Sequence, residues 1–346
     1  MSQDFSVVVM AAGKGTRMKS ELPKVLHPLC GRTLLGHAMK AAADTDPRQV
    51  IVVVRHDRDS VAAHAQEMNP EVIIADQDQI PGTGRAVQCG LDQTLRDGIE
   101  LGGTVVVTSG DVPLLSASTL SELVSQHLEE GAAVTLATAF PPDPHGYGRV
   151  LRDPDDPQRV SRIVEQKDAS PEELEVRETN AGIYAFDTQF LLEALGSLGT
   201  QNAQGEVYLT DVVSAATAAG LKSVPFVLQD TWEAQGCNDL VQLAELRDVL
   251  TARLAQNHML SGVRIEAPNQ VSIDVQAVLE PDCVILPGSR LLGNTVVETG
   301  ASVGPCTTLD GVRVGAGARV PHSHLTGGAV PAGAHVPAFT AAVDGS

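Results

Sequence analysis

The residues best suited to chemistry lie in a short glycine-rich segment near the start of the chain. Gly13 and Gly15 directly follow an apolar run, and three cations, Lys14, Arg17 and Lys24, surround them. Glycines at the end of a strand let backbone amides approach phosphate oxygens with no side chain in the way. The rest of the chain is strongly acidic, with a formal net charge of -19. This local change of sign predicts a triphosphate site.

Two better known phosphate-binding motifs do not fit this segment. The dinucleotide fingerprint would have a third glycine where this chain has Met18, and the GK[ST] ending of a Walker A loop is missing. The plain alternative is a strand–turn–helix connection with solvated lysines. The motif extends well beyond its glycines, which favours the phosphate site.

Composition limits the partners and the location of the protein. Lys and Arg total 24 against 43 for Asp and Glu, and such a surface repels nucleic acid and anionic lipid. The apolar runs are shorter than the roughly 20 residues that cross a bilayer. The N-terminus has no basic region typical of a secretory signal, and the five cysteines show no CxxC spacing. We therefore expect a cytoplasmic protein that binds neither nucleic acid nor membrane.

Short apolar runs alternate with amphipathic stretches over the first two-thirds of the chain. The expected strands are Ser6–Met10, Val50–Val54, Val72–Ala75 and Thr104–Thr108. Apolar strands separated by helices predict an α/β, Rossmann-like, mostly parallel sheet covered on both faces. Ligands of such sheets bind beyond the carboxyl ends of the strands. The loops after Met10 and Thr108 are therefore expected to carry the chemistry.

The last third of the chain has a different pattern. Leucines at helical spacing predict a long helix over 239–262. Aliphatic residues then recur every six positions from Ile273 to Leu309, each followed four residues later by a small one. This repeat predicts a short left-handed parallel β-helix, with a β-sandwich as the alternative. Val314 and Val320 fall one place early, so we expect the solenoid to be short and to fray or be capped near its end.

A family resemblance rests on the segment MAAGKGTRMKSELPKVL, which resembles the signature of sugar-phosphate nucleotidyltransferases. Its extension, PKVLHPLCGRTLL, is similar to bacterial N-acetylglucosamine-1-phosphate uridylyltransferases. The resemblance implies transfer of UMP from UTP to N-acetylglucosamine 1-phosphate, with release of pyrophosphate. It implies catalytic roles for Arg17 and Lys24. It also implies that the nucleotide is bound by Met10, Ala11, Ala12, Gly13, Gly15, Lys24, Gln77, Gly82 and Thr83.

Two further motifs of the resemblance concern the base and a metal ion. Gln77 with the GTG that starts at Gly82 matches an element that reads uracil in the family, and a side-chain amide can both donate to and accept from a pyrimidine. Asp111 and Asn238 match the family's Mg²⁺ ligands, although Ser109 replaces the aromatic residue usual before Gly-Asp. The alternatives are a turn-forming Asp111 and an Asn238 that caps the following helix.

The sugar side of the resemblance is an ordered series of polar motifs. It implies that the hydroxyls and N-acetyl group are bound by Gly148, Glu165, Asn180, Tyr208 and Thr210. Such a pocket should be polar with few charges, because recognition of hydroxyls depends on paired hydrogen bonds. The sugar phosphate is already an anion, so no covalent intermediate is expected. Catalysis then consists of positioning and charge neutralisation.

We expect a nucleotidyltransferase domain at 1–238, a linker helix at 239–262, a β-helix at 263–338 and a tail at 339–346. The resemblance implies a homotrimer through the β-helix. The later acetyltransferase motifs of the bifunctional family have no counterpart, and His322, His324 and His335 lie where the register has changed, so acetyl transfer is not expected. Three alternatives stay open: the same chemistry on another sugar 1-phosphate (of glucose, glucosamine or a deoxy sugar), the bifunctional enzyme, and a non-catalytic nucleotide-sugar-binding scaffold.

Overall fold

The computed structural model describes residues 4–343 and divides into two compact units. Unit 1 comprises Met1–His27 and Leu34–Asp239, and unit 2 comprises Pro28–Thr33 and Leu240–Ser346. The short segment Pro28–Thr33 therefore belongs with the later part of the chain, although it is surrounded in sequence by residues of unit 1.

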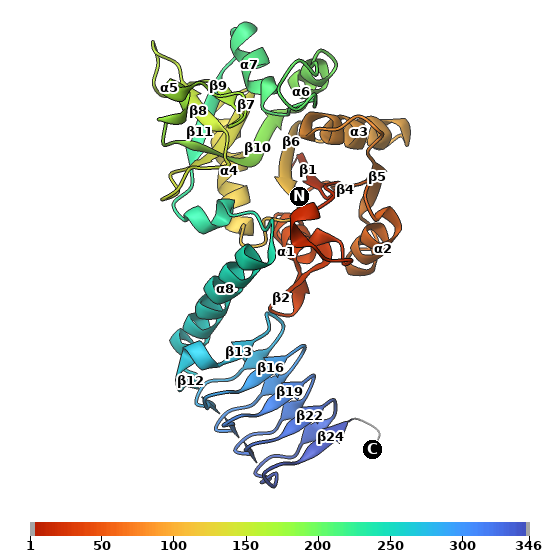
Figure 1. Cartoon of the computed structure of the whole chain (residues 1–346). Helices are drawn as coiled ribbons and strands as arrows, with labels where there is room; N and C mark the ends of the chain where they lie inside the picture. The colour runs from red at the N-terminus through yellow and green to blue at the C-terminus, as the bar shows by residue number, and fades with distance from the viewer. Residues whose placement is uncertain (1–3, 344–346) are drawn as a thin grey trace. The chain divides into compact units, whose positions relative to one another are not determined.

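Unit 1 is built on a nine-stranded, mostly parallel sheet, as predicted (Figure 1). Seven strands form the path β11-β7-β10-β6-β1-β4-β5, and β8 and β9 extend it beside β10. β10 is antiparallel to β6 and β7, whereas β1 runs parallel to β4 and β6. The strands are β1 Phe5–Met10, β4 Val50–Val54, β5 Ile73–Asp76, β6 Thr104–Ser109, β7 Val134–Ala139, β8 Arg149–Arg152, β9 Val160–Val164, β10 Thr179–Asp187 and β11 Ser223–Val227.

Helices cover both faces of this sheet, which explains why its strands are apolar throughout. Val7 and Val9 belong to one buried cluster with residues of α1, α2 and α4. Val8 belongs to the other, with residues of α3, α6 and α7. The helices are α1 Leu34–Ala43, α2 Arg58–Met68, α3 Thr83–Arg96, α4 Ala117–Glu130, α5 Pro171–Leu174, α6 Thr188–Leu195 and α7 Asp211–Ala218, with short 3₁₀ turns η1 Thr16–Met18, η2 Lys24–Leu26 and η3 Thr231–Ala234.

The register of the parallel strands brings four loops to one edge of the sheet. Met10 at the end of β1 lies opposite Val53 on one side and Ser109 on the other. The first amide after β1, that of Ala11, donates to Val53 O at 2.8 Å. The amide of Gln77 after β5 donates to Val54 O at 2.9 Å. Segments far apart in sequence thus meet where a parallel sheet offers a ligand site.

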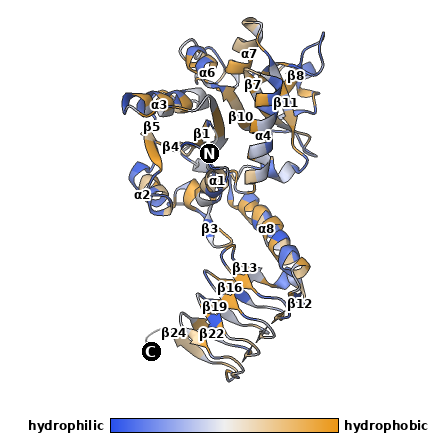
Figure 2. Cartoon of the chain, turned by 180° about the vertical axis from the view of Figure 1, so that it is seen from behind, coloured by the Kyte–Doolittle hydropathy of each residue, from blue (hydrophilic) through white to orange (hydrophobic). Residues whose placement is uncertain are grey.

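Unit 2 contains helix α8 (Leu240–Leu260), the hairpin of β2 (Pro28–Leu29) and β3 (Arg32–Thr33), and a stack of short parallel strands. Figure 2 shows hydrophilic and hydrophobic residues alternating along α8, whose buried residues include Leu243 and Leu246. The helix begins at Leu240, so Asp239 rather than Asn238 immediately precedes it.

The short strands of unit 2 form three parallel sheets, in the order β12-β15-β18-β21, β13-β16-β19-β22-β24 and β14-β17-β20-β23. They make the predicted left-handed parallel β-helix. The strands are β12 Arg264–Ile265, β13 Ser272–Ile273, β14 Val278–Leu279, β15 Val284–Ile285, β16 Arg290–Leu292, β17 Val296–Val297, β18 Ser302–Val303, β19 Thr308–Asp310, β20 Arg313–Val314, β21 Arg319–Val320, β22 His324–Thr326, β23 Ala329–Val330 and β24 Ala341–Val343, with the 3₁₀ turn η4 Pro268–Gln270 near the start.

The six-residue period has a direct physical basis in these coils. The aliphatic residues of the repeat are buried, as Leu291 and Leu309 illustrate. The small residues are also buried, and their hydroxyls bond to nearby backbone. Thr295 Oγ1 donates to Leu292 O at 2.6 Å, and Ser289 Oγ donates to Leu286 O at 2.7 Å. A larger side chain at these corners would displace backbone.

The coils continue where the period changes after Leu309. Val314 pairs with Val330, Leu309 pairs with Leu325, and all four side chains are buried. These pairs are closer in sequence than Leu291 and Leu309, which are also stacked partners. The coils therefore shorten at their turns, while the aliphatic residues remain in the core.

The three histidines near the end of the chain are exposed. His324 lies in β22, His335 forms an isolated β-bridge with Arg319, and the ring of His322 stacks on that of Phe339 with centroids 5.6 Å apart. Ala341–Val343 is a strand that pairs with β22, so this part of the expected tail adds to the coil, whereas 344–346 lie outside the described residues. Over residues 4–343, no helix is long and apolar enough to cross a membrane.

Candidate active site

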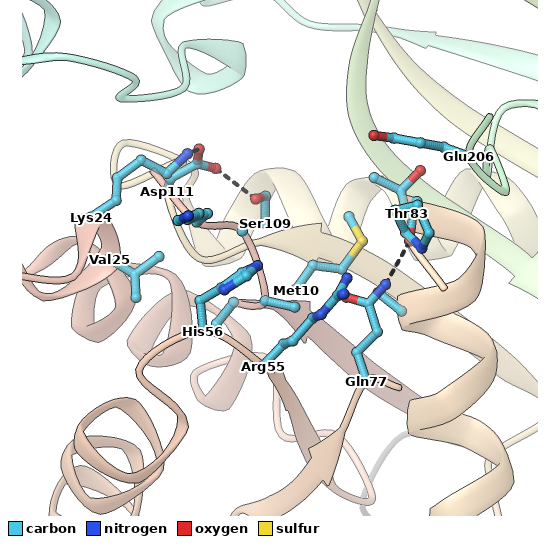
Figure 3. A pocket seen from close by; sticks show the side chains of 17 residues that line it. Met10, Lys24, Val25, Arg55, His56, Gln77, Thr83, Ser109, Asp111 and Glu206 are labelled. Atoms are coloured by element: carbon cyan, nitrogen blue, oxygen red, sulfur yellow. Dashed lines mark hydrogen bonds and ion pairs between the residues drawn. The ribbon is translucent and has the colours of Figure 1, made fainter. Parts of the chain in front are cut away.

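A cavity of about 320 Å³ opens at the carboxyl edge of the sheet in unit 1 (Figure 3). The loops after β1, β4, β5 and β6 all contribute to it, together with η2 and the start of α3. Its lining residues are Met10, Ala11, Ala12, Gly13, Lys14, Lys24, Val25, Arg55, His56, Gln77, Pro81, Gly82, Thr83, Ala86, Ser109, Asp111 and Glu206. Most of the residues predicted to bind the nucleotide are thus brought together.

The two glycines of the first loop have different roles. A Cβ atom at Gly13 would meet nothing within 4 Å, so the loop leaves open space beside its backbone. Gly15 has a φ of +63°, and a Cβ atom there would lie 2.5 Å from Lys24 Cβ. Gly15 is absent from the cavity lining, and its lack of a side chain instead makes room for the stem of Lys24.

Lys24 and Asp111 form an ion pair at one end of the cavity. Their side chains are 13% and 14% exposed. Ser109 Oγ donates to the other carboxylate oxygen, Asp111 Oδ1, at 2.6 Å. The serine that departs from the family's aromatic residue therefore holds the carboxylate in place.

Arg17 and Asn238 form a second pair near Asp111. Arg17 Nη2 donates to Asn238 Oδ1 at 2.8 Å, and Arg17 is absent from the cavity lining. A Cβ atom at Gly236 would lie 3.8 Å from Asp111 Oδ2 and 3.9 Å from Asn238 Nδ2. The amide of Cys237 also donates to Asp111 O at 2.9 Å. The turn at Gly236 thus brings the two predicted metal ligands close together.

The donor set of Asp111 and Asn238 fits a hard divalent cation. Such ions take carboxylate and amide oxygens and complete their shell with water and substrate phosphates. Within the part of the chain that the structure describes, no group of three or more His, Cys, Asp or Glu residues could hold a metal ion. This pair is therefore suited to an ion that a phosphorylated substrate shares.

The loop from Gln77 to Gly82 is held in a compact form. Gln77 Nε2 donates to Ile80 O at 3.0 Å and to Gly82 O at 3.2 Å, so its oxygen is the atom suited to meet a base. Gly82 has a φ of +119°, and a Cβ atom there would lie 2.2 Å from Val207 O. Thr83 Oγ1 accepts from the amide of Leu209 at 3.1 Å.

The predicted sugar residues lie outside the cavity lining, and four of the five form a connected group. Thr210 Oγ1 donates to Glu165 Oε1 at 3.1 Å, and the amide of Asn180 donates to Gly148 O at 2.9 Å. A Cβ atom at Gly148 would lie 3.6 Å from Glu165 Oε2. The hydroxyl of Tyr184 donates to Asn180 Oδ1 at 2.9 Å.

Tyr208 connects this group to the base loop through the backbone. Its neighbour Val207 donates from its amide to Pro81 O at 3.0 Å and accepts from the amide of Gly84 at 2.9 Å. The hydroxyl of Tyr208 donates to Asp168 Oδ2 at 3.2 Å and accepts from Gln204 Nε2 at 2.9 Å. The chain around Tyr208 thus bridges the two groups of predicted residues.

Carboxylates dominate the electrostatics around the sugar residues. Burial raises the pKa of Glu165, and the nearby charges of Asp168, Asp211 and Glu206 act in the same direction, against the hydrogen bond from Thr210. Burial and Asp168 likewise raise the pKa of Asp211. Glu165 and Asp211 are therefore protonated more easily than exposed carboxylates.

Arg55 and His56 line the cavity although the sequence reasoning did not select them. The pKa of His56 is lowered by burial and by the positive charges of Arg55 and Lys14. The signal that could have found them is their position directly after Val50–Val54, the strand beside β1. The rule that ligands bind at carboxyl ends applies to this loop as well as to those after β1 and β6.

Comparison with known proteins agrees with this geometry. The family described as MobA-like NTP transferase domain matches residues 7–154. "Bifunctional protein GlmU" of Kineococcus radiotolerans is 51% identical over 96% of this chain and 67% of the relative. Its namesakes from Pseudarthrobacter chlorophenolicus and Rhodococcus jostii are 49% and 46% identical, over 97% and 98% of this chain and 68% of each relative. The chain spans about two thirds of the length of these relatives.

Proposed function

This chain belongs to the GlmU family of nucleotidyltransferases, and we propose that it transfers UMP from UTP to N-acetylglucosamine 1-phosphate. One observation carries the proposal. One cavity is lined by a loop suited to reading a base, by a backbone suited to phosphates, and by the Lys24–Asp111 pair. A phosphate oxygen of the sugar attacks the α-phosphorus, the bond to the β-phosphate oxygen breaks, and pyrophosphate leaves.

The chain's own groups act mainly through charge and position. Two polyanions must approach in line, and negative charge develops on the departing pyrophosphate. Lys24 and Lys14 in the cavity and Arg17 beside it are the cations suited to oppose that charge. The attacking sugar phosphate is already ionised near neutral pH, so the reaction needs no side-chain base and no covalent intermediate.

Asp111 and Asn238 would hold a divalent cation, which we propose is Mg²⁺. When bound, the ion supplies charge neutralisation to the phosphates of both substrates. Lys24 and Arg17 pair with these two residues, and they are therefore close enough to shift from the ligands to substrate phosphates. The clustered oxygens and the adjacent cations support this arrangement.

The group around Glu165 would bind the sugar. Thr210, Asn180 and the backbone of Gly148 offer hydroxyl, amide and carbonyl partners beside the carboxylate, which suits hydroxyl and N-acetyl groups. A site built to pair such groups rejects analogues that lack them, because its own polar atoms would then be buried without partners. This favours N-acetylglucosamine over glucose and deoxy sugars.

We also propose that the chain assembles as a homotrimer through the β-helix. Stacked coils present continuous side faces, and the parallel pairing of strands in unit 2 continues through Val330. Light scattering after gel filtration measures the mass directly. A monomer at micromolar concentration would refute this assembly and would leave the proposed chemistry unaffected.

The direct test is a substrate panel read by pyrophosphate release. Purified chain with UTP and Mg²⁺ is given the 1-phosphates of N-acetylglucosamine, glucose and glucosamine, and Asp111→Asn serves as the catalytic control. We expect N-acetylglucosamine 1-phosphate to be preferred by at least about tenfold, as the loss of a paired buried group implies. Preference for glucose 1-phosphate would redirect the proposal to another sugar. Binding by calorimetry without pyrophosphate release would refute catalysis.

The relatives are named as bifunctional proteins, and our proposal concerns the reaction of unit 1. Incubation with acetyl-CoA and glucosamine 1-phosphate tests the second activity separately.

A further inference from the structure

Arg55 is a cavity residue that the proposed reaction does not yet use. It directly follows β4, and Figure 3 shows it between His56 and Gln77. Its guanidinium Nη2 donates to Gln79 O at 3.1 Å. Gln79 lies in the loop whose two ends, Gln77 and Gly82, also line the cavity. Arg55 therefore contacts both the cavity and the segment suited to reading a base.

The other contacts of this loop show what Arg55 adds. The amide of Gln77 donates to Val54 O, which ties the start of the loop to β4. Gln77 Nε2 closes the loop on Ile80 and Gly82. At the tip, Asp78 Oδ1 accepts from the amide of Ile80 at 3.0 Å. These contacts fix the shape of the loop, whereas Arg55 attaches its tip to the sheet.

Helix α3 holds Asp78 through a second arginine. Arg85 Nε donates to Asp78 Oδ2 at 3.0 Å, and this contact lowers the pKa of Asp78 and keeps it ionised. The loop is therefore bonded to two arginines, Arg85 from α3 and Arg55 directly after β4. A loop held at two points loses little conformational entropy when a ligand binds.

We propose that Arg55 is a positioning residue for nucleoside recognition. Its guanidinium holds the tip of the loop so that Gln77 Oε1 and the backbone at Gly82 meet the base in a preset geometry. The inference rests on the proposed function, because it takes this loop as the base-binding segment. The competing role, direct binding of phosphates, is suggested by the proximity of Lys14 and His56, and the two roles predict different results.

The test measures affinity for uridine, UMP, UDP and UTP by calorimetry, with the full chain and its Arg55→Ala and Arg55→Lys variants. We expect Arg55→Ala to lower the affinity for all four ligands by the same factor, about three- to tenfold, which corresponds to one lost hydrogen bond. Arg55→Lys should recover part of the loss, since an ammonium can still donate to Gln79 O. Discrimination between UTP and CTP should narrow, while kcat with saturating UTP stays within about twofold.

Arg58→Ala is the matched control. Arg58 pairs with Asp76 at the end of β5 through a 2.9 Å contact, is about half exposed, and does not line the cavity. It removes one positive charge from the same region, and we expect its affinities to match wild type. Circular dichroism and thermal unfolding confirm that each variant is folded.

Three results would overturn the role of Arg55. A loss that grows from uridine to UTP would identify a phosphate ligand instead. If Arg55→Ala binds all four ligands with wild-type affinity, Arg55 has no role in their recognition. If Arg58→Ala loses as much affinity as Arg55→Ala, the loss reflects the removal of positive charge in general. Failure of the wild-type chain to bind uridine nucleotides or release pyrophosphate would refute the proposed function itself, which is a separate result.

Discussion

The proposed nucleotide and sugar regions of unit 1 differ in the groups that they present. Around the nucleotide cavity, backbone and cations predominate: Gly13 leaves open space, Gly82 lies against Val207, and Lys14, Lys24 and Arg55 line the cavity. Around the predicted sugar site, side chains bond to one another, as Thr210 does to Glu165, and the charges that act on Glu165 are carboxylates. Both regions share the backbone around Val207 and Tyr208.

The difference follows from the ligands that the two regions suit. A triphosphate needs amides and cations close to its oxygens, and glycines allow that approach. In a chain of net charge -19, such a cluster must be built locally. A sugar needs directional partners for hydroxyls, which side chains supply and which an acidic chain has in excess. Substitutions should therefore act through charge and backbone in one region, and through single hydrogen bonds in the other.

The largest effect on turnover is expected at Asp111, which would hold the proposed ion. Asp111→Asn keeps the size of the side chain but removes the charge that pairs with Lys24 and would hold the metal. We expect kcat for pyrophosphate release to fall by about 10²- to 10³-fold. A chelator should abolish the wild-type activity, and added Mg²⁺ should restore it.

Asp44→Asn is the control for this change, because Asp44 also pairs with a lysine, Lys40, but on the exposed surface of α1. Its activity should equal that of wild type, since exposed ion pairs contribute little. Turnover of Asp111→Asn within a few-fold of wild type would place the metal elsewhere and remove the basis for comparing the two regions.

Two glycines, one in each region, give the next largest effect. A Cβ atom at Gly82 would lie 2.2 Å from a backbone oxygen, at a φ of +119°. At Gly148 the nearest atom would be Ile163 Cγ2 at 3.1 Å, and no positive φ is involved. We expect Gly82→Ala to raise KM for UTP by at least about tenfold, because backbone must move, and Gly148→Ala to change KM for the sugar phosphate by less. Equal effects would mean that backbone matters similarly in both regions.

Part of this site could be predicted from the sequence, because its motifs are contiguous. The loop from Met10 to Lys14 and the element that includes Gln77 and Gly82 are short segments with local geometry, and both line the cavity. Arg55 was missed because its position depends on strand order: the pairing of β1 with β4 brings it to the same edge. Sequence periodicity indicates a strand but does not determine its neighbours.

The β-helix shows the complementary limit. A strict period of six predicts its first coils but not the shorter spacing after Leu309. The coils continue through Leu325 and Val330, with shorter turns between buried positions. What the fold conserves is the stacking of aliphatic residues rather than the number of residues between them, and a fixed period cannot represent that.

Glu165 tests whether single side chains dominate the sugar region. Glu165→Gln keeps an oxygen that can accept from Thr210 Oγ1 but removes the carboxylate. We expect KM for N-acetylglucosamine 1-phosphate to rise about tenfold, as for a lost charge-assisted hydrogen bond, and KM for UTP to stay unchanged. A rise in both constants would mean that the two regions are not independent.

We also expect the difference in stability between Glu165→Gln and wild type to depend on pH. Burial raises the pKa of Glu165 above its ordinary value of 4.5, so the folded chain holds this proton more tightly than the unfolded chain. The corresponding stabilisation is complete below that ordinary value and is lost as the pH rises through the raised pKa. Glu165→Gln should therefore exceed wild type in free energy of unfolding at pH 8, with a difference that shrinks towards pH 5. Urea unfolding at both pH values measures it, and a constant difference would contradict the cause.

The smallest effect is expected on metal-ion affinity in the absence of substrate, when a cation of the proposed nucleotide region is removed. Lys24 occupies an oxygen of Asp111 that the proposed metal would use, so the two compete. Removing the ammonium should tighten binding of Mn²⁺, a spectroscopic substitute for Mg²⁺, by about three- to tenfold in Lys24→Gln without nucleotide.

Lys14→Gln is the matched control, because it removes a cavity cation that forms no ion pair with Asp111 in the described structure. Its smaller gain, measured by electron paramagnetic resonance, separates direct competition from general charge. Equal gains in both variants would show that the cations of this region act only through their summed field, and the contrast with the sugar region would then be one of net charge rather than of specific contacts.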